Sequence, residues 1–176
     1  MCGIVGYLGS RDGRQIVIDG LRRLEYRGYD SAGIAVVADG ELYIRKKAGK
    51  IANLAAAIEA DPLPESGTAI GHTRWATHGA PTDANSHPHV AGRIAIVHNG
   101  IIENHEELRS ALKAKGYEFT SQTDTEVVAH LVHSLVLGGL SLTDAVAKAI
   151  KQLHGAYALA VISSREPGTV VGTRRG

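Results

Sequence analysis

The chain has 176 residues, and its 19 basic and 18 acidic side chains leave a formal net charge of +1. This length predicts one domain over residues 1–176, and the balanced charge does not indicate nucleic acid or a membrane surface as a partner. The single cysteine excludes an internal disulfide and is typical of a reducing compartment, so we expect a cytoplasmic protein. No apolar stretch is long enough to span a bilayer, and the first residues lack a signal-peptide pattern.

The predicted elements are helices and strands without a regular repeat. Residues 14–25 are predicted to form a helix, because Val17, Leu21 and Leu24 fall on one stripe. The dipeptide Asp39-Gly40 is a strong hairpin signal, and Thr-Asp-Thr-Glu at 123–126 is a capping box that opens another helix. The other expected elements are strands at 3–9, 32–37, 41–45, 69–73, 93–98, 156–163 and 169–172, and helices at 51–58, 104–115 and from 141 onward.

Strand pairs between helices predict an α+β fold, in which helices cover antiparallel sheet. The glycines at 3–9 follow Gly-x-x-Gly-x-x-Gly rather than Gly-x-Gly-x-x-Gly, so we do not expect a dinucleotide site. A strand that stops at Gly172 is followed by only four residues. We therefore expect the fold to be incomplete at its C-terminal end.

Cys2 directly follows Met1, so removal of Met1 would place a free α-amine beside the thiol of Cys2. An α-amine titrates near about 8 and a thiol near about 8.5, which makes proton exchange between them feasible near neutral pH. An N-terminal amine is a known base for a side-chain nucleophile. The alternative is that Cys2 is a small buried apolar residue. If Met1 is retained, its amide bond leaves Cys2 without that base.

Residues 71–79 place many hydrogen-bonding groups at the end of a predicted strand. Arg74 offers a planar fork suited to a carboxylate, Trp75 could close over a ligand, and Thr77 adds a hydroxyl. The alternative is a strand edge with a surface arginine and a half-buried tryptophan. Asp124 is either an acid at the positive end of a helix or a carboxylate that receives an ammonium group. With Arg74, it could hold both ends of an amino acid.

The dipeptide Asn99-Gly100 follows an apolar strand and has two interpretations. It is a common pair for a type I′ hairpin turn. It could equally form an oxyanion hole, in which the Asn99 side-chain amide and the Gly100 backbone N–H donate to a developing negative oxygen. The motif alone does not separate the two.

Nine histidines raise the question of a metal site. The sequence contains no His-Glu-x-x-His motif and no Cys/His cluster with zinc spacing, so we expect no metal and regard a zinc hydrolase as the rival interpretation. We expect most of these histidines to be hydrogen-bonding loop residues. The candidates considered are His72, His78, His87, His89, His98 and His105.

Four motifs together resemble the glutaminase domain of class II glutamine amidotransferases. They are Cys-Gly-Ile-Val-Gly at 2–6, Leu-Glu-Tyr-Arg-Gly-Tyr-Asp-Ser-Ala-Gly at 24–33, Gly-His-Thr-Arg-Trp-Ala-Thr-His-Gly at 71–79 and His-Asn-Gly-Ile-Ile-Glu-Asn at 98–104. The resemblance runs from Cys2 to the last residue. It implies the N-terminal-nucleophile hydrolase sandwich, αββα, with two antiparallel sheets between helical layers and with the C-terminal part of the domain absent.

The resemblance also implies roles at the reacting centre. Cys2 is expected to be the nucleophile, with its own α-amine as base, and Asn99 and Gly100 are expected to form the oxyanion hole. The thiolate would attack the side-chain amide of glutamine and release ammonia, and water would then hydrolyse the γ-glutamyl thioester to glutamate. No metal or organic cofactor is needed for these steps.

Further residues are expected from the resemblance to bind glutamine or to support the site. Arg74, assisted by Thr77, would bind the α-carboxylate, and Asp124 would receive the α-ammonium. Trp75 and His78 belong to the loop that would close over glutamine. The residues expected behind this first layer are Arg27, His87 and His98.

Tyr26 and Tyr29, together with Trp75 after Arg74, favour one branch of the family. In that branch, glutamine hydrolysis supplies ammonia for the synthesis of glucosamine 6-phosphate from fructose 6-phosphate. The expected partners are therefore glutamine and a sugar isomerase domain that accepts the ammonia and is missing here. Full-length members commonly form homodimers through that other domain. The alternative is an inactive glutamine-binding or interaction fragment that lacks a complete site.

Overall fold

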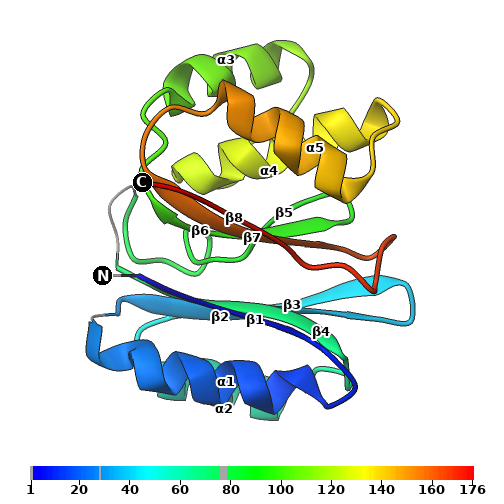
Figure 1. The fold of residues 1–176 in the computed structure, drawn as a ribbon. Coiled ribbons are helices and arrows are strands. Elements are labelled where there is room, and N and C mark those ends of the chain that lie inside the picture. The colour runs from blue at the N-terminus through cyan, green and yellow to red at the C-terminus, as the bar shows by residue number, and fades with distance from the viewer. Residues whose placement is uncertain (1, 28, 76–78) are drawn as a thin grey trace.

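Two antiparallel sheets lie face to face between two layers of helices (Figure 1). A computed structural model describes residues 2–27, 29–75 and 79–176, although not the side chain of Arg27. One sheet has the strand order β1-β4-β2-β3 and the other has the order β5-β6-β7-β8. All neighbouring strands are antiparallel. This is the predicted α+β sandwich.

The first sheet, sheet A, is built from the N-terminal part of the chain. In it, β4 lies between β1 and β2, so that Gly3 is opposite Thr73 and Ser31 is opposite Arg74. Its strands are β1 (Gly3–Leu8), β2 (Ser31–Ala38), β3 (Glu41–Ala48) and β4 (Thr68–Arg74). The elements on its outer side are α1 (Gly13–Leu24), the short helix η1 (Glu25–Arg27) and α2 (Ile51–Ala60).

The second sheet, sheet B, follows in the C-terminal part. Here β6 is the inner neighbour of β7, with Asn99 opposite Ala158. Its strands are β5 (His89–Ala91), β6 (Ile94–Gly100), β7 (Tyr157–Ser163) and β8 (Val171–Arg175). The covering helices are α3 (His105–Ala114), α4 (Asp124–Leu137), α5 (Leu142–Ala149) and the short η2 (Ile150–Gln152).

The central strands are buried on both faces, and alternate residues enter different cores. In β6, for example, Ala95 and Val97 face the other sheet, whereas Ile94 and Ile96 face the helices. This explains why these strands read as nearly continuous apolar runs in the sequence. The core between the sheets consists of Ala35, Val37, Ile70, Ala95, Val97, Ala160 and Ile162.

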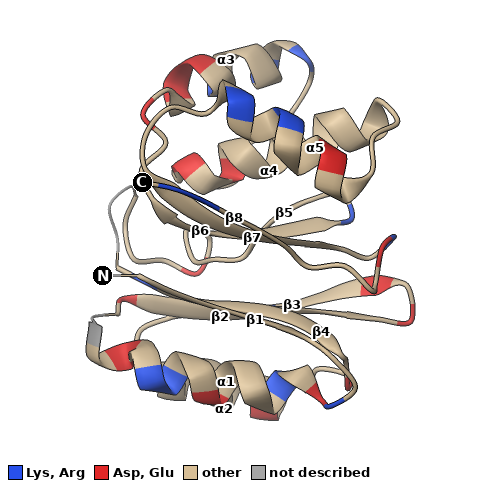
Figure 2. Ribbon diagram, in the orientation of Figure 1, with Lys and Arg blue, Asp and Glu red and all other residues tan. Residues whose placement is uncertain are grey.

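Charged side chains lie mainly on the outer helices and connecting loops (Figure 2). The central strands β2, β4, β6 and β7 carry one charged side chain, Arg74, which is consistent with their burial on both faces. The edge strands β3 and β8 are more exposed and carry the others. In the part of the chain that is described, no helix combines the length and the apolar character needed to cross a bilayer.

Several local predictions can be compared with the structure. The hairpin at Asp39-Gly40 is confirmed, with φ of 52° and 75° at the two residues, as a type I′ turn requires. The last strand was placed wrongly, because β8 starts at Val171 and continues to Arg175 rather than ending at Gly172. The short strand β5 was not predicted, since its three residues lie just before the strand that was expected at 93–98.

Candidate active site

Cys2 lies immediately before β1, at the end of the sandwich where β4 and β6 also end. Its Sγ accepts a hydrogen bond from the backbone N–H of Trp75 (3.1 Å) and lies 3.4 Å from the Trp75 carbonyl oxygen. Burial raises the pKa of the Cys2 thiol, and the Trp75 N–H and the charge of Arg74 offset this only in part. The group is therefore a thiol at neutral pH, and attack on a substrate requires a base.

Arg74 is the last residue of β4 and is 3% exposed, which excludes the surface arginine that we considered as an alternative. Its guanidinium donates to the carbonyl oxygens of Ala80 (3.2 Å) and Gly79 (3.3 Å). Burial lowers the pKa of Arg74, whereas the negative charges of Asp30 and Asp124 act in the opposite direction. The arginine is thus a buried cation within electrostatic range of both Cys2 and Asp124.

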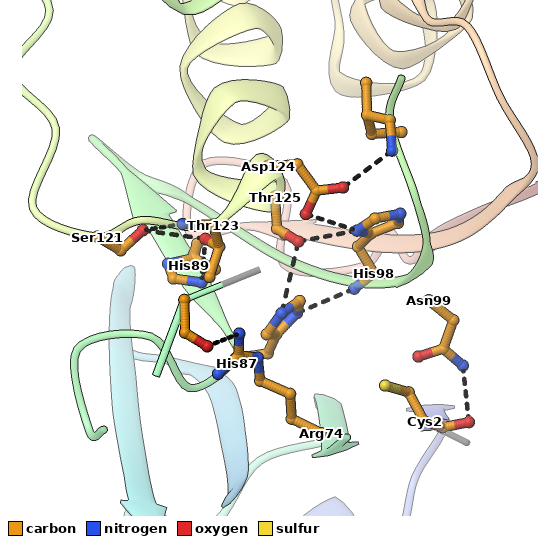
Figure 3. A network of polar contacts seen from close by, with 12 residues as sticks. Cys2, Arg74, His87, His89, His98, Asn99, Ser121, Thr123, Asp124 and Thr125 are labelled. Carbon is orange, nitrogen blue, oxygen red and sulfur yellow. Dashed lines mark hydrogen bonds and ion pairs between the residues drawn. The ribbon is translucent and has the colours of Figure 1, made fainter. Parts of the chain in front are cut away.

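Asn99 and Gly100 are the last two residues of β6 and pair with β7. The hairpin-turn interpretation of this dipeptide is therefore wrong. The Asn99 side chain lies between the two sheets. Its Nδ2 donates to the Cys2 carbonyl oxygen at 3.1 Å (Figure 3). Its Oδ1 lies 2.9 Å from His72 Nε2. Gly100 has a φ of +108°, and a Cβ atom at this position would overlap the carbonyl oxygen of Ala156.

Asp124 is the first residue of α4 and is 3% exposed. Its Oδ2 accepts the backbone N–H of Ile102 (2.9 Å), and its Oδ1 lies 3.7 Å from His98 Nδ1. The carboxylate thus joins the start of α4 to the segment that follows Asn99 and Gly100. It also lies at the end of a helix where negative charge is favoured.

The predicted capping box at 123–126 is wrong in its contacts, although α4 does begin there. Thr123 directs its hydroxyl to His89 Nε2 (2.9 Å) instead of to the helix. Glu126 reaches further back, where its carboxylate accepts the backbone N–H groups of Thr120 (2.9 Å) and Ser121 (2.6 Å). The Glu126 carboxylate therefore accepts hydrogen bonds from the loop before α4 and not from the N-cap residue Thr123.

Buried histidines lie on one side of Cys2 and Asn99, and three of them, His87, His89 and His98, are seen in Figure 3. His87 Nδ1 accepts the backbone N–H of His98 (3.3 Å), and His98 Nδ1 lies 2.8 Å from the Thr125 hydroxyl. The rings of His72 and His87 are stacked, with centroids 4.0 Å apart. Burial lowers the pKa of His72 to about 3 and that of His87 well below its ordinary value, so both rings are neutral.

The structure brings together most of the residues proposed from the sequence. Cys2, Arg74, Asn99, Gly100 and Asp124 come from both sheets and from the start of α4. His87 and His98 lie behind them, and Trp75 is 53% exposed next to Cys2. Thr77, His78 and the side chain of Arg27, which were also predicted to belong to the site, lie outside the described residues.

Comparison with known proteins then decides the family. A sequence model of the glutamine amidotransferase domain matches residues 72–175. The chain belongs to the glutamine amidotransferase family. Among similar proteins, the glutamine–fructose-6-phosphate aminotransferases (isomerizing) of Pseudomonas putida KT2440 and Escherichia coli K12 are 57% and 56% identical to it. Both alignments include all of this chain but 29% of the relative, so the chain spans less than a third of their length.

Solved structures of amidotransferases have the same fold. The glutamine phosphoribosylpyrophosphate amidotransferase from B. subtilis is 31% identical, with a TM-score of 0.79 over 93% of this chain and 35% of that chain. A glutamine aminotransferase class-II domain protein from Silicibacter pomeroyi has a TM-score of 0.65 over 100% of this chain and 77% of its own, and at 21% identity it shows the fold alone. These neighbours confirm the predicted N-terminal-nucleophile hydrolase sandwich.

Two residues of this amidotransferase domain were not predicted as part of the site. His72 had no role assigned beyond its place in the motif at 71–79 and among the metal-ligand candidates, yet its ring contacts Asn99. Gly33 had no role assigned beyond its place in the motif at 24–33, yet a Cβ atom there would overlap the His87 carbonyl oxygen. The sequence feature that could have pointed to His72 and Gly33 is that they lie inside the motifs at 71–79 and 24–33. Within the described ranges, no group of three or more His, Cys, Asp or Glu side chains could hold a metal ion.

Proposed function

We propose that this chain hydrolyses glutamine to glutamate and ammonia, with Cys2 as the nucleophile once Met1 has been removed. One observation carries the proposal: the Asn99 amide, 97 positions along the chain, donates to the backbone of Cys2 (3.1 Å). A thiol and a side-chain N–H donor from the other sheet therefore occupy one end of the sandwich. This is the pairing that acyl transfer from an amide requires.

The first step is attack of Cys2 Sγ on the side-chain carbonyl carbon of glutamine. Because burial keeps the thiol protonated, a base must take its proton, and the α-amine of a processed Cys2 is the nearest group of suitable pKa. The carbonyl oxygen becomes negative in the tetrahedral intermediate. The Asn99 Nδ2–H and the Gly100 N–H are proposed to donate to it.

The second step expels ammonia and leaves a γ-glutamyl thioester on Cys2. The proton that the base removed from sulfur passes to the leaving nitrogen, so charge and atoms balance. Water then attacks the thioester through the same kind of intermediate and releases glutamate and the free thiol. Metal ions and organic cofactors take no part in this proposal.

We propose that Arg74 and Asp124 hold the two charged ends of glutamine. Arg74 is the buried cation beside Cys2, and Asp124 is the buried carboxylate at the start of α4. Opposite charges at these two places match the α-carboxylate and the α-ammonium of an amino acid. Trp75, Thr77 and His78 are proposed to complete the binding loop, with Arg27, His87 and His98 supporting the site.

We also propose a larger context, which follows from the names of the relatives. Those proteins are aminotransferases that act on fructose 6-phosphate, and the matched part is 29% of their length. We infer that residues 1–176 are a glutaminase domain that supplies ammonia to a sugar isomerase domain. A cytoplasmic location and a homodimer in the full-length protein belong to the same proposal.

Release of glutamate from glutamine is the test. Mass spectrometry should show that Met1 has been removed, and an electrophilic glutamine analogue should label Cys2 in the native chain. Cys2→Ala should reduce glutamate release by at least about 1,000-fold, because no other group replaces the nucleophile. Undiminished release by Cys2→Ala would refute the proposal. Retained Met1 with no labelling would instead favour an inactive binding module.

A further inference from the structure

His72 lies in the middle of the site but contacts the reacting centre only through another side chain. It belongs to β4, where it is opposite Ile4 of β1 and Gly33 of β2. The side chain is fully buried, and Nε2 lies 2.8 Å from the His98 carbonyl oxygen and 2.9 Å from Asn99 Oδ1. A single ring nitrogen of sheet A therefore reaches two residues of sheet B.

The His98 carbonyl oxygen determines which nitrogen of His72 carries the proton. A carbonyl oxygen can only accept, so a bare Nε2 at 2.8 Å would place two lone pairs against each other. Nε2 must therefore be the protonated nitrogen. Nδ1 is then bare, and none of the described residues gives it a hydrogen-bond partner.

The same proton also determines the orientation of the Asn99 amide. Because Nε2–H donates, the amide atom that faces it at 2.9 Å must be the oxygen. The nitrogen Nδ2 is consequently turned toward Cys2, whose carbonyl oxygen it contacts at 3.1 Å. Rotation of the amide by 180° would set two donors against each other at His72 and turn an acceptor toward Cys2.

The His72 ring is itself held in place. It is stacked on His87 with 11° between the ring planes, and His87 in turn contacts β6 through the His98 backbone N–H. Burial keeps the pKa of His72 at about 3, so the ring remains neutral in ordinary buffers. A neutral ring in a fixed position has one available tautomer here, and that tautomer is the donor at Nε2.

We propose that His72 is a positioning residue, whose Nε2–H holds the Asn99 amide with Nδ2 directed toward Cys2, where the side-chain carbonyl group of glutamine would react. The effect of this orientation on the rate of glutamine hydrolysis rests on the proposed glutaminase function. The orientation of the amide does not rest on it and can be measured independently.

Two substitutions separate the donor from the bulk of the ring. Gln at position 72 keeps a neutral N–H donor at similar reach, whereas Leu fills similar space without one. We expect His72→Leu to lower kcat for glutamate release by about 10- to 100-fold with little change in KM, as for loss of preorganised oxyanion donation. His72→Gln should recover at least about tenfold of that loss. His89→Leu is the matched control, because His89 is buried nearby but its Nε2 contacts Thr123.

Nitrogen NMR reports the protonation of the His72 ring nitrogens and the hydrogen bonding of the Asn99 side-chain amide. If His72 only filled space in the core, its replacement would not change the Asn99 signals in this way. In the native chain, His72 should show a protonated Nε2 and a bare Nδ1, and the Asn99 side-chain amide should give one sharp pair of proton signals. In His72→Leu, this pair should shift and exchange faster with water, whereas in His89→Leu it should stay in place.

Three results would overturn the inference. They are a His72 protonated at Nδ1, a native kcat in His72→Leu, and equal losses in the Leu and Gln variants. If His72→Leu does not fold, the tautomer in the native chain and the kcat of His72→Gln still decide the matter. If the native chain releases no glutamate, the proposed function fails. The NMR signals alone then test whether His72 fixes the orientation of the Asn99 amide.

Discussion

At the scale of single residues, Gly33 shows how one missing methyl group positions the site. It lies in β2, where the carbonyl oxygen of His87 comes so close that a Cβ atom would overlap it. The loop that carries His87 can therefore pack against sheet A only over a glycine. Because His87 is stacked on His72, the position of this loop also affects the ring beside Asn99.

We predict that Gly33→Ala destabilises the chain by about 1–3 kcal/mol, because the loop or β2 must move. Urea denaturation followed by circular dichroism measures this change. Gly168→Ala is the matched control, since a Cβ atom there would meet open space and should change stability by less than about 0.5 kcal/mol. Equal stability of the two variants would contradict this account of Gly33.

The sequence predicted individual residues unevenly. Cys2 and Arg74 could be proposed because position and chemical type carry information: the cysteine is the only one, and the arginine follows a strand. The burial of Arg74 could not be predicted, because it depends on contacts with the Gly79 and Ala80 carbonyl oxygens that form only in the folded chain. The contact between His72 and Asn99 also joins two sheets, and no local pattern encodes it.

At the scale of elements, the start of α4 combines two tasks. Asp124 faces the site, while Glu126, two residues on, organises the loop before the helix. The Glu126 carboxylate accepts from Thr120 and Ser121 and lies 3.1 Å from His130 Nε2. Burial would raise the pKa of Glu126, but these hydrogen bonds outweigh it and lower the pKa to about 2.

This lowered pKa predicts an acid-dependent stability. The unfolded carboxyl titrates near about 4.3, so between that pH and about 2 the unfolded chain binds more protons than the folded one. The stabilisation by Glu126 is therefore fully present above about pH 4.3 and is lost as the pH falls toward 2. Glu126→Gln should remove this contribution and lower stability at pH 7 by about 1.5–3 kcal/mol.

Urea denaturation of the native and Glu126→Gln chains at pH 7, 5, 4 and 3 checks this prediction. The difference between them should be largest at pH 7 and shrink with acidity. Replacement of the exposed Glu59 by Gln should leave the whole profile nearly unchanged. A constant difference at all pH values would show that the carboxylate charge is not what stabilises the loop.

Helices and turns with a strong local sequence pattern were predicted correctly, whereas patterns with two possible interpretations led to wrong predictions. The helices at 13–24 and 142–149 and the hairpin at Asp39 follow apolar periodicity and turn chemistry. The dipeptide Asn99-Gly100 looked like a turn because both residues favour one, but pairing with β7 holds it at a strand end. The capping box failed because His89 offers Thr123 a better partner in the folded chain.

At the scale of the whole molecule, the site is complete only when the two sheets meet. Cys2 and Arg74 come with sheet A, and Asn99 and Gly100 come with sheet B. The core that separates the sheets contains three alanines, Ala35, Ala95 and Ala160, which allow a close approach. The α+β class followed from the sequence, but the strand orders join segments far apart in the chain and could not be derived from local patterns.

We predict that enlarging the inter-sheet core impairs the site more than it impairs stability. Ala95→Leu adds bulk between the sheets, and Ala145→Leu adds the same bulk in the core between sheet B and its helices, at an equally buried position. Both should cost about 1–3 kcal/mol. Only Ala95→Leu should move Cys2 away from Asn99, so only it should slow labelling of Cys2 by a glutamine analogue by tenfold or more.

Labelling rates under native conditions, with denaturation curves of both variants, check this prediction. Similar labelling rates in the two variants at similar stability would mean that inter-sheet spacing does not control the site. A slower rate in Ala145→Leu than in Ala95→Leu would contradict it directly.

The separation of Cys2 from Asn99 by 97 positions also orders events during translation. The thiol leaves the ribosome early, while its amide partner and the β7 strand that pairs beside it are still to be synthesised. A nascent chain therefore carries the Cys2 thiol without its Asn99 partner until β6 packs against sheet A. Under the proposed function, the chain can release ammonia only after β6 has brought Asn99 to Cys2.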